Sequence, residues 1–296
     1  MLDVNLNVDI NTSGISDVGI KLIESITRAC SILYEPKHAV RMAESEAKIA
    51  IIKEQSKIEI SDIKLRGLER LLRSEERKQR NIEKTIRLAA VNIPINAKVN
   101  DLDEDWTYHL FNHCELVSDE LMQSLWANIL IGEATNPGSF SKRTINQVAS
   151  MDKRDAELFT SVCQFAWVID DEPTLLVLDD YDPIYSEKGI SPSTLNHLSS
   201  IGLIQFKQSA QYYLDISKNT VTANYFEHKF TFDSKNHKPI ILHPGIAIFT
   251  EVGKQLFKVC GAQFNNEFIK YSIELLARKN NSFHISKIST EDDTQS

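Results

Sequence analysis

Two histidines are the first side chains whose spacing suggests chemistry. His109 and His113 lie four residues apart, so in a helix they share one face, and Cys114 and Glu115 follow directly. Imidazole, thiolate and carboxylate groups all bind zinc, so this cluster would form half of a metal site. Because the other histidines are scattered and no second half is evident, we expect ordinary, partly buried histidines and neither a bound metal nor a cofactor.

A second candidate is the triplet Glu227-His228-Lys229, which Asp215 precedes. In metal-dependent nucleases, carboxylates in a similar arrangement hold Mg²⁺ and a lysine assists the attacking water. Such triplets are common by chance, and an exposed hairpin with alternating charges explains this one equally well. A nuclease is therefore the weaker alternative, and we assign no catalytic residue.

Other short motifs indicate no binding or catalytic site. The acidic run of Asp179, Asp180 and Asp182 lacks the spacing, the glycine and the final glutamate of a calcium-binding EF-hand loop, so we expect an acidic surface loop. The sequence contains no phosphate-binding glycine loop, nucleophile elbow or HExxH zinc motif.

A short helix after Ser191-Pro192 could contact DNA bases. Serine and proline favour a helix start, Gly202 favours its end, and the apolar residues that follow favour a strand, an order similar to that of winged-helix modules. The polar residues of this helix are Ser193, Thr194, Asn196 and His197. Residues 151–261 carry 10 basic and 14 acidic side chains, so this module would repel phosphate and is better suited to contacts with protein.

One basic segment stands out from an acidic chain. The formal net charge is −8, yet residues 41–87 hold 13 basic and 9 acidic side chains. A nucleic-acid-binding alternative would use the contacts Arg70, Arg73, Arg77, Lys78 and Arg80, in a basic run that continues through Lys84 and Arg87. No aromatic residue interleaves these charges, so base stacking has no support, and a solvated face with neighbouring glutamates is the simpler interpretation.

The elements that carry these residues begin with a predicted strand over residues 2–10, where apolar and polar residues alternate. An amphipathic helix follows and ends near Pro36. We expect its apolar face, from Val18 to Leu33, to pack on a core or a neighbouring subunit, with peripheral membrane contact as the weaker interpretation.

Residues 37–93 contain one glycine and no proline, and Pro94 follows directly. This composition predicts one long helix or two nearly continuous ones. A helix of this length needs a partner, and its apolar positions follow a heptad pattern that Glu75 and Gln79 interrupt. We therefore expect a homo-oligomer with a coiled-coil character, formed through Leu65, Leu68, Leu72, Ile82 and Ile86.

The remaining residues divide into a helical domain over 94–166, an α+β module over 167–285 with a small antiparallel sheet, and a disordered tail over 286–296. Strands are expected at Tyr212–Ile216, Tyr225–Phe232 and Ile240–Ile248, and helices at Thr250–Val259 and Glu267–Lys279. The fold class is thus α+β and mostly α.

Composition agrees with a folded protein of the cytosol. With 42% hydrophobic and 25% charged residues, the chain is ordinary globular material, and it shows neither a signal peptide nor a spanning segment. Its four cysteines, Cys30, Cys114, Cys163 and Cys260, form no closely spaced pair, so we expect free thiols.

Several segments resemble a bacterial family catalogued as domain of unknown function 2806. They are Leu33-Tyr34-Glu35-Pro36, Arg77 to Glu83, and above all Ser118 to Glu133 with Pro137 to Thr144. The resemblance covers most of residues 14–260 and implies a prophage-linked or phage-defence role, but it brings no catalytic residues. Within the matching segments, Glu133, Lys142 and Arg143 are the polar residues that are candidates for a role beyond structural support.

The leading hypothesis is a non-enzymatic, oligomeric interaction protein whose acidic C-terminal module faces a partner protein. The alternatives are nucleic-acid binding through the basic helix or the winged-helix-like module, and a metal-dependent nuclease.

Overall fold

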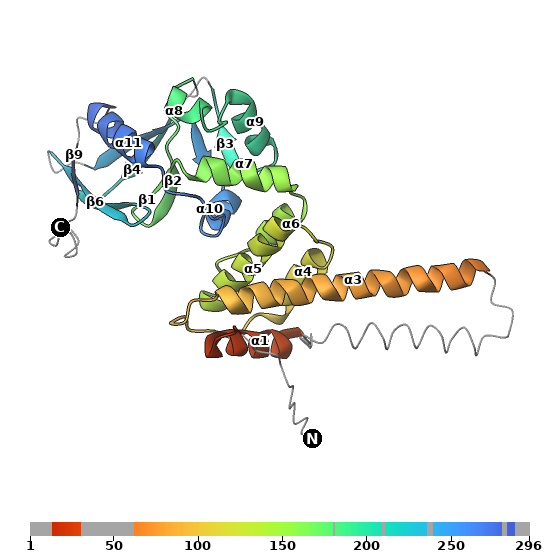
Figure 1. Cartoon of the computed structure of the whole chain (residues 1–296). Coiled ribbons are helices and arrows are strands. Elements are labelled where there is room, and N and C mark those ends of the chain that lie inside the picture. The colour runs from red at the N-terminus through yellow and green to blue at the C-terminus, as the bar shows by residue number, and fades with distance from the viewer. Residues whose placement is uncertain are drawn as a thin grey trace. The chain divides into compact units, whose positions relative to one another are not determined.

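A computed structural model describes residues 14–30, 62–179, 181–208, 211–235, 239–279 and 283–287. The chain divides into two compact units, residues 1–149 and 150–296. The described part of the first unit is helical, and the second unit mixes helices with antiparallel strands (Figure 1). The predicted class, α+β and mostly α, is confirmed.

The described helices of the first unit are α1 (Asp17–Cys30), α3 (Asp62–Asn92), α4 (Glu104–Cys114), α5 (Glu120–Thr135) and α6 (Lys142–Ala149). Aspartates begin two of these helices, because the Asp103 carboxylate accepts from Trp106 N and the Asp119 carboxylate accepts from Leu121 N and Met122 N. The long helix α3 packs against α5, α1 and α4, and α4 also packs against α6.

Small residues let α1 approach α3 closely. A Cβ placed on Gly19 would lie 2.2 Å from the Ala90 carbonyl oxygen, so only glycine fits there. The apolar face of α1, with Leu22, Ile23 and Ile26, is buried inside this unit. These three side chains therefore pack inside the unit, and the weaker interpretation of Val18 to Leu33 as a peripheral membrane contact stays a prediction. No described helix is long and apolar enough to cross a membrane.

The second unit contains helices α7 (Lys153–Cys163), α8 (Pro183–Ser186), α9 (Pro192–Ser200), α10 (Glu251–Phe257) and α11 (Asn266–Lys279). Its strands are β1 (Ala166–Ile169), β2 (Glu172–Leu175), β3 (Ile204–Phe206), β4 (Tyr212–Ile216), β5 (Thr220–Tyr225), β6 (His228–Ser234), β7 (Ile240–Gly245), β8 (Ala247–Phe249) and β9 (Phe283–Lys287). An antiparallel sheet has the order β2-β1-β5-β6-β9, while β3 pairs with β8 and β4 with β7.

Aromatic side chains fill the core of the second unit. Trp167 contacts the rings of Tyr225, Phe230 and Phe232, and Phe165 contacts Phe268. The Tyr225 hydroxyl donates to the Gln164 carbonyl at 2.7 Å, so its polar end is satisfied inside the core.

Several predicted boundaries shift in the second unit. The strand expected at Tyr225–Phe232 is the β5–β6 hairpin, turned at Phe226 and Glu227, and the strand expected at Ile240–Ile248 is divided into β7 and β8 next to Gly245. The predicted domain boundary near residue 166 lies inside this unit, which also contains α7. Ser286 and Lys287, placed in the tail, belong to β9.

The predicted helix after Ser191 is confirmed as α9, and the Ser191 hydroxyl accepts from Thr194 N. The strand β3 follows it but pairs with β8, about 40 residues later, and not with a neighbouring wing strand. The winged-helix comparison stays a prediction. The strand over residues 2–10, the first part of the long helix over 37–61, and residues 288–296 lie outside the described residues.

Candidate functional site

The helix α3 has two parts with different surroundings. In its C-terminal half, Ile82 is 7% exposed and Ile86 is fully buried, so both belong to the core of their own unit. The prediction that they contact partner copies is therefore corrected. The N-terminal half extends beyond the other labelled helices of the unit (Figure 1), and there Leu65, Leu68 and Leu72 are half-buried.

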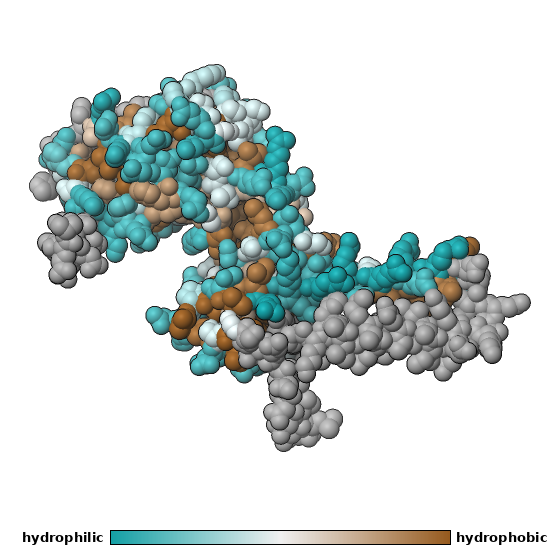
Figure 2. All heavy atoms as spheres, in the orientation of Figure 1, coloured by the Kyte–Doolittle hydropathy of each residue, from teal (hydrophilic) through white to brown (hydrophobic). Residues whose placement is uncertain are grey.

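A basic stripe runs along the outer face of α3. When Leu65 and Leu68 are taken as heptad positions a and d, every b and f position from residue 66 to residue 87 is basic. The stripe consists of Arg66, Arg70, Arg73, Arg77, Arg80, Lys84 and Arg87, and all seven side chains are exposed. At 1.5 Å per residue it spans about 32 Å. The face of α3 visible in Figure 2 is mainly hydrophilic.

Only part of this stripe is neutralised by carboxylates. Arg80 pairs with Glu76 at 3.2 Å and Lys84 with Glu120 at 3.2 Å. Arg70, Arg73 and Arg77 form no ion pair with a described residue. Three of the five predicted nucleic-acid contacts are therefore exposed and uncompensated.

The fourth predicted contact, Lys78, lies outside the stripe. Its ammonium pairs with Glu75 at 2.9 Å and with Glu115 at 3.4 Å. Hydrogen bonds to these two carboxylates raise the pKa of Lys78 above its ordinary value. Lys78 therefore links α3 to the end of α4 and is less available to an external ligand.

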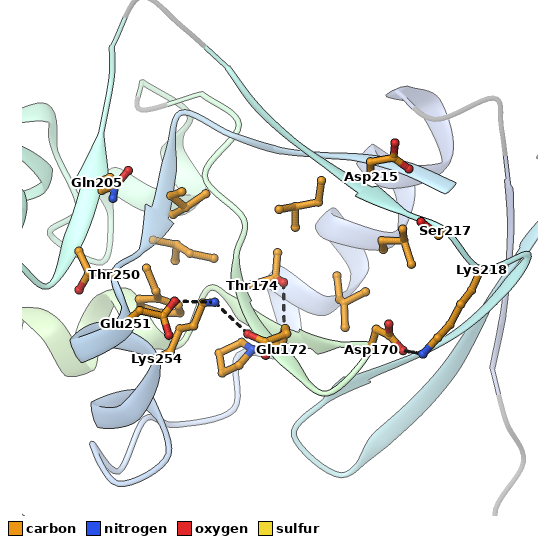
Figure 3. Close-up of a pocket in the computed structure, with 17 residues that line it drawn as sticks. Asp170, Glu172, Thr174, Gln205, Asp215, Ser217, Lys218, Thr250, Glu251 and Lys254 are labelled. Carbon is orange, nitrogen blue, oxygen red and sulfur yellow. Dashed lines mark hydrogen bonds and ion pairs between the residues drawn. The ribbon is translucent and has the colours of Figure 1, made fainter. Parts of the chain in front are cut away.

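The second unit contains a cavity of about 650 Å³. Its apolar lining comes from β1, β2, β4 and β8, and consists of Ile169, Pro173, Leu175, Leu214, Ile216, Ile248 and Phe249. Its ionisable lining is Asp170, Glu172, Asp215, Lys218, Glu251 and Lys254 (Figure 3). The residues of this cavity are far apart along the chain, so no sequence pattern indicates it.

Two groups of ion pairs stabilise the charged rim of the cavity. Lys218 contacts Asp170 at 2.5 Å, and Lys254 lies between Glu172 at 2.9 Å and Glu251 at 3.0 Å (Figure 3). Asp170 and Asp171 both have positive φ, at 54° and 65°, as the two-residue turn between β1 and β2 requires. The Lys218 pair thus anchors a turn that aspartate adopts less readily than glycine.

The histidine pair forms no metal site among the described residues. His109 lies 2.7 Å from Asn146 Oδ1 through its Nε2 atom, and its ring contacts that of His113 edge to face. Cys114 is fully buried, and burial raises its pKa, which disfavours the thiolate that a metal needs. No group of three or more potential metal ligands is found in the described part of the chain.

The nuclease-like residues are not brought into one sheet. Asp215 lies on β4, which pairs with β7, whereas Glu227 is in the turn of the β5–β6 hairpin. In the acidic run, the Asp179 side chain accepts from Tyr181 N, while Asp182 caps α8 and accepts from the Tyr271 hydroxyl. These described aspartates have local structural partners.

Two of the polar residues of α9 form hydrogen bonds inside the second unit. Thr194 takes part in the helix cap, and His197 Nε2 lies 2.6 Å from Asp155 Oδ1 on α7. Burial opposes ionisation of Asp155, but the His197 contact, a hydrogen bond from Asp152 N and nearby positive charge together hold its pKa below the ordinary value. Ser193 and Asn196 remain exposed.

Glu133 has a structural role inside the first unit. Its carboxylate is 6% exposed and accepts from Gly138 N at 2.6 Å and from Phe140 N at 2.9 Å, which fixes the loop between α5 and α6. Lys142 and Arg143 are exposed at the start of α6. The residues of Ser118 to Thr144 therefore form a helix, a loop and a helix start around a buried carboxylate.

These features describe an α+β protein with a helical unit that carries a basic stripe and a mixed unit that contains a cavity. A family model described as "Protein of unknown function (DUF2806)" matches residues 65–272, and the chain belongs to this family. The match includes most of α3, all of the central helices and the cavity. Comparison with curated proteins gave no match. Comparison with solved structures gave none either.

Proposed function

We propose that this protein is a non-enzymatic interaction protein that self-associates through the N-terminal half of α3. The supporting observation is that the apolar a and d positions Leu65, Leu68 and Leu72 lie in the half of α3 that extends beyond the other labelled helices of the unit (Figure 1). Nearby, Leu71 is 57% exposed. A second copy would bury these side chains and leave the basic stripe, on the opposite face, in solvent.

The native mass of the full chain tests this proposal. We expect a defined oligomer by light scattering and a monomer after L68D together with L72D, because two carboxylates in the seam would be desolvated without partners. The matched control is L116D, since Leu116 is 57% exposed and lies outside α3. A monomeric wild-type chain, or an unchanged mass in the double variant with its helicity retained, would overturn the proposal.

The basic stripe favours a second function, the binding of duplex nucleic acid. Its length of about 32 Å is close to one turn of B-form DNA, about 34 Å. The absence of any aromatic residue in α3 argues against stacking on unpaired bases. Guanidinium groups that form no ion pair with a described residue would instead contact phosphates, without reading sequence.

Fluorescence anisotropy with labelled duplex DNA, measured over a range of salt concentrations, tests this second function. Replacing Arg70, Arg73 and Arg77 with alanine should weaken binding by at least about tenfold and reduce the salt dependence by about two to three released ions. Replacing the exposed Lys229, Lys235 and Lys258 with alanine gives the same change in net charge and should have little effect. Equal losses of DNA affinity in both triple variants would show that binding depends on the net charge of the protein and not on the stripe.

The cytosolic setting, the partner protein and the prophage or phage-defence role belong to this proposal as well.

A further inference from the structure

We propose that the cavity of the C-terminal unit binds an extended, positively charged peptide segment as an added β-strand beside β4. The occupant is a segment of a partner protein in which basic and apolar residues alternate. The proposal depends on the strand edges and charges of the cavity, and is independent of self-association through α3.

The cavity lies beside the edges of two strands. Its lining includes the consecutive residues 172–175 of β2 and 214–218 at the end of β4. Successive side chains of a strand point to opposite faces, so one face alone would contribute only every second residue. The cavity contacts all four residues of β2 and the last three of β4, so it lies alongside these parts of the two strands.

Within their strand bounds, neither edge pairs with a further strand among the described residues, although the β2 edge continues to Val177, which bridges Gly245. β2 is the terminal strand of its sheet, and β4 pairs only with β7. Leu176 N donates to the Phe165 carbonyl, so alternation directs the main-chain groups of Glu172 and Thr174 toward β1 and those of Pro173 outward. Proline has no N–H to donate. At the outer edge of β2, Pro173 therefore removes no hydrogen bond from the existing sheet, but it also offers no donor to an added strand. An incoming segment would bond mainly to β4.

The pattern of β4 determines the composition of that segment. Leu214 and Ile216 are half-buried and line the cavity, whereas Asp215 between them is exposed and points away from the middle of the cavity (Figure 3). An added strand would place apolar side chains beside Leu214 and Ile216, and a basic one beside Asp215.

Charge selects a basic segment over an acidic one. Four carboxylates and two ammonium groups line the cavity. Lys218 and Lys254 are already bound to Asp170, Glu172 and Glu251, whereas Asp215 forms no ion pair with a described residue. An acidic segment would meet like charges across the strand pair, which is destabilising.

The probe is a fluorescent, alternating lysine–valine peptide, and its binding to the full chain is followed by fluorescence polarisation. We expect it to bind at least about tenfold more tightly than the matching glutamate–valine peptide. Methylation of alternate amide nitrogens on the edge that faces β4 should weaken binding by a similar factor, because it removes main-chain donors. Methylation on the other edge is the control.

Charge reversal on the protein completes the test. D215K should weaken binding of the lysine–valine peptide by at least about tenfold, whereas E187K, at another exposed carboxylate of the same unit with the same change in net charge, should leave it within about twofold. No binding to the wild-type chain, equal binding of the glutamate–valine peptide, or equal binding to D215K would overturn the proposal. Unchanged affinity of both methylated peptides would also overturn it, since the cavity would then bind side chains without adding a strand.

Discussion

The two units organise their charged residues in different ways. In the first unit one helix, α3, carries the whole basic stripe, and three of its arginines have no ion pair with a described residue. In the second unit the charged groups of the cavity come from separate strands, loops and α10, and both lysines are bound to carboxylates. The first surface is thus suited to an extended polyanion or a second helix, and the second to a segment of defined shape and charge.

The cores of the two units also differ in whether they are built from local or long-range contacts. Burial in the first unit comes from amphipathic helices whose periodicity follows directly from the sequence. Burial in the second comes from ring contacts between distant segments, such as Trp167 with Tyr225 and Phe165 with Phe268. A site built on such a core depends on long-range packing, so changes to the backbone should affect the second unit most severely.

The largest expected effect is that of G245A in the second unit. Gly245 has φ of +107°, and a Cβ there would lie 1.8 Å from the Val177 carbonyl oxygen. The strained backbone and the clash together should destabilise the unit by at least about 3 kcal/mol. Hydrogen exchange measured by mass spectrometry should show loss of protection in β7 and β8, with α3 to α5 unaffected.

The control for this change is G189A. Gly189 also has positive φ, at +77°, but nothing lies within 4 Å of its Cβ position. It should cost only about 1 kcal/mol. Equal losses for both variants would show that backbone conformation, and not the close approach of Val177 to Gly245, determines the effect.

A smaller effect is expected for E133A in the first unit. Removal of the carboxylate leaves Gly138 N and Phe140 N without their acceptor. Phe140 is buried and Gly138 is exposed, so the expected cost is about 1–3 kcal/mol. Urea unfolding followed by tryptophan fluorescence should report it, because Trp106 and Trp126 lie in this unit. A loss below about 0.5 kcal/mol would mean that the loop does not depend on Glu133.

E133Q separates charge from shape in this experiment. The amide retains one acceptor oxygen, so about half of the loss should be recovered. E104A, at the exposed first turn of α4, is the control for the removal of one negative charge from the same unit.

The contrast between the units also explains what could be predicted from sequence. Aspartate and serine caps, heptad spacing and the start of α9 at Ser191-Pro192 are local signals, and they located α3, α5, α9 and α11 correctly. Strand pairing is not local. The predicted strand at Tyr225–Phe232 missed the turn at Phe226 because a non-glycine residue with positive φ gives no signal of its own.

The candidate surfaces show the same limit. Leu65, Ile82 and Ile86 have the same periodicity, but the sequence could not show that α1, α4 and α5 already cover the C-terminal half of α3. The seven basic b and f positions can be read from the sequence. The predicted contacts were instead chosen because they are close together along the chain. That choice included Lys78, which lies on another face of the helix. The cavity combines residues from 169 to 254, and no spacing rule links them.

The smallest expected effect concerns the contact between α7 and α9 in the second unit. The pKa of Asp155 is held below its ordinary value of 3.8, so the folded state favours the ionised carboxylate. This contribution is fully present above the ordinary pKa and is lost as the pH falls through the lowered value. D155N should therefore destabilise the protein by about 1 kcal/mol at pH 6 and by nearly nothing at a pH below the lowered pKa of Asp155. Urea unfolding at several pH values measures the difference, with D171N at an exposed aspartate as the control. A pH-independent loss in D155N would assign the contribution to hydrogen-bond geometry alone, whereas the expected slope would make the contact between Asp155 and His197 an acid-sensitive element of the C-terminal unit.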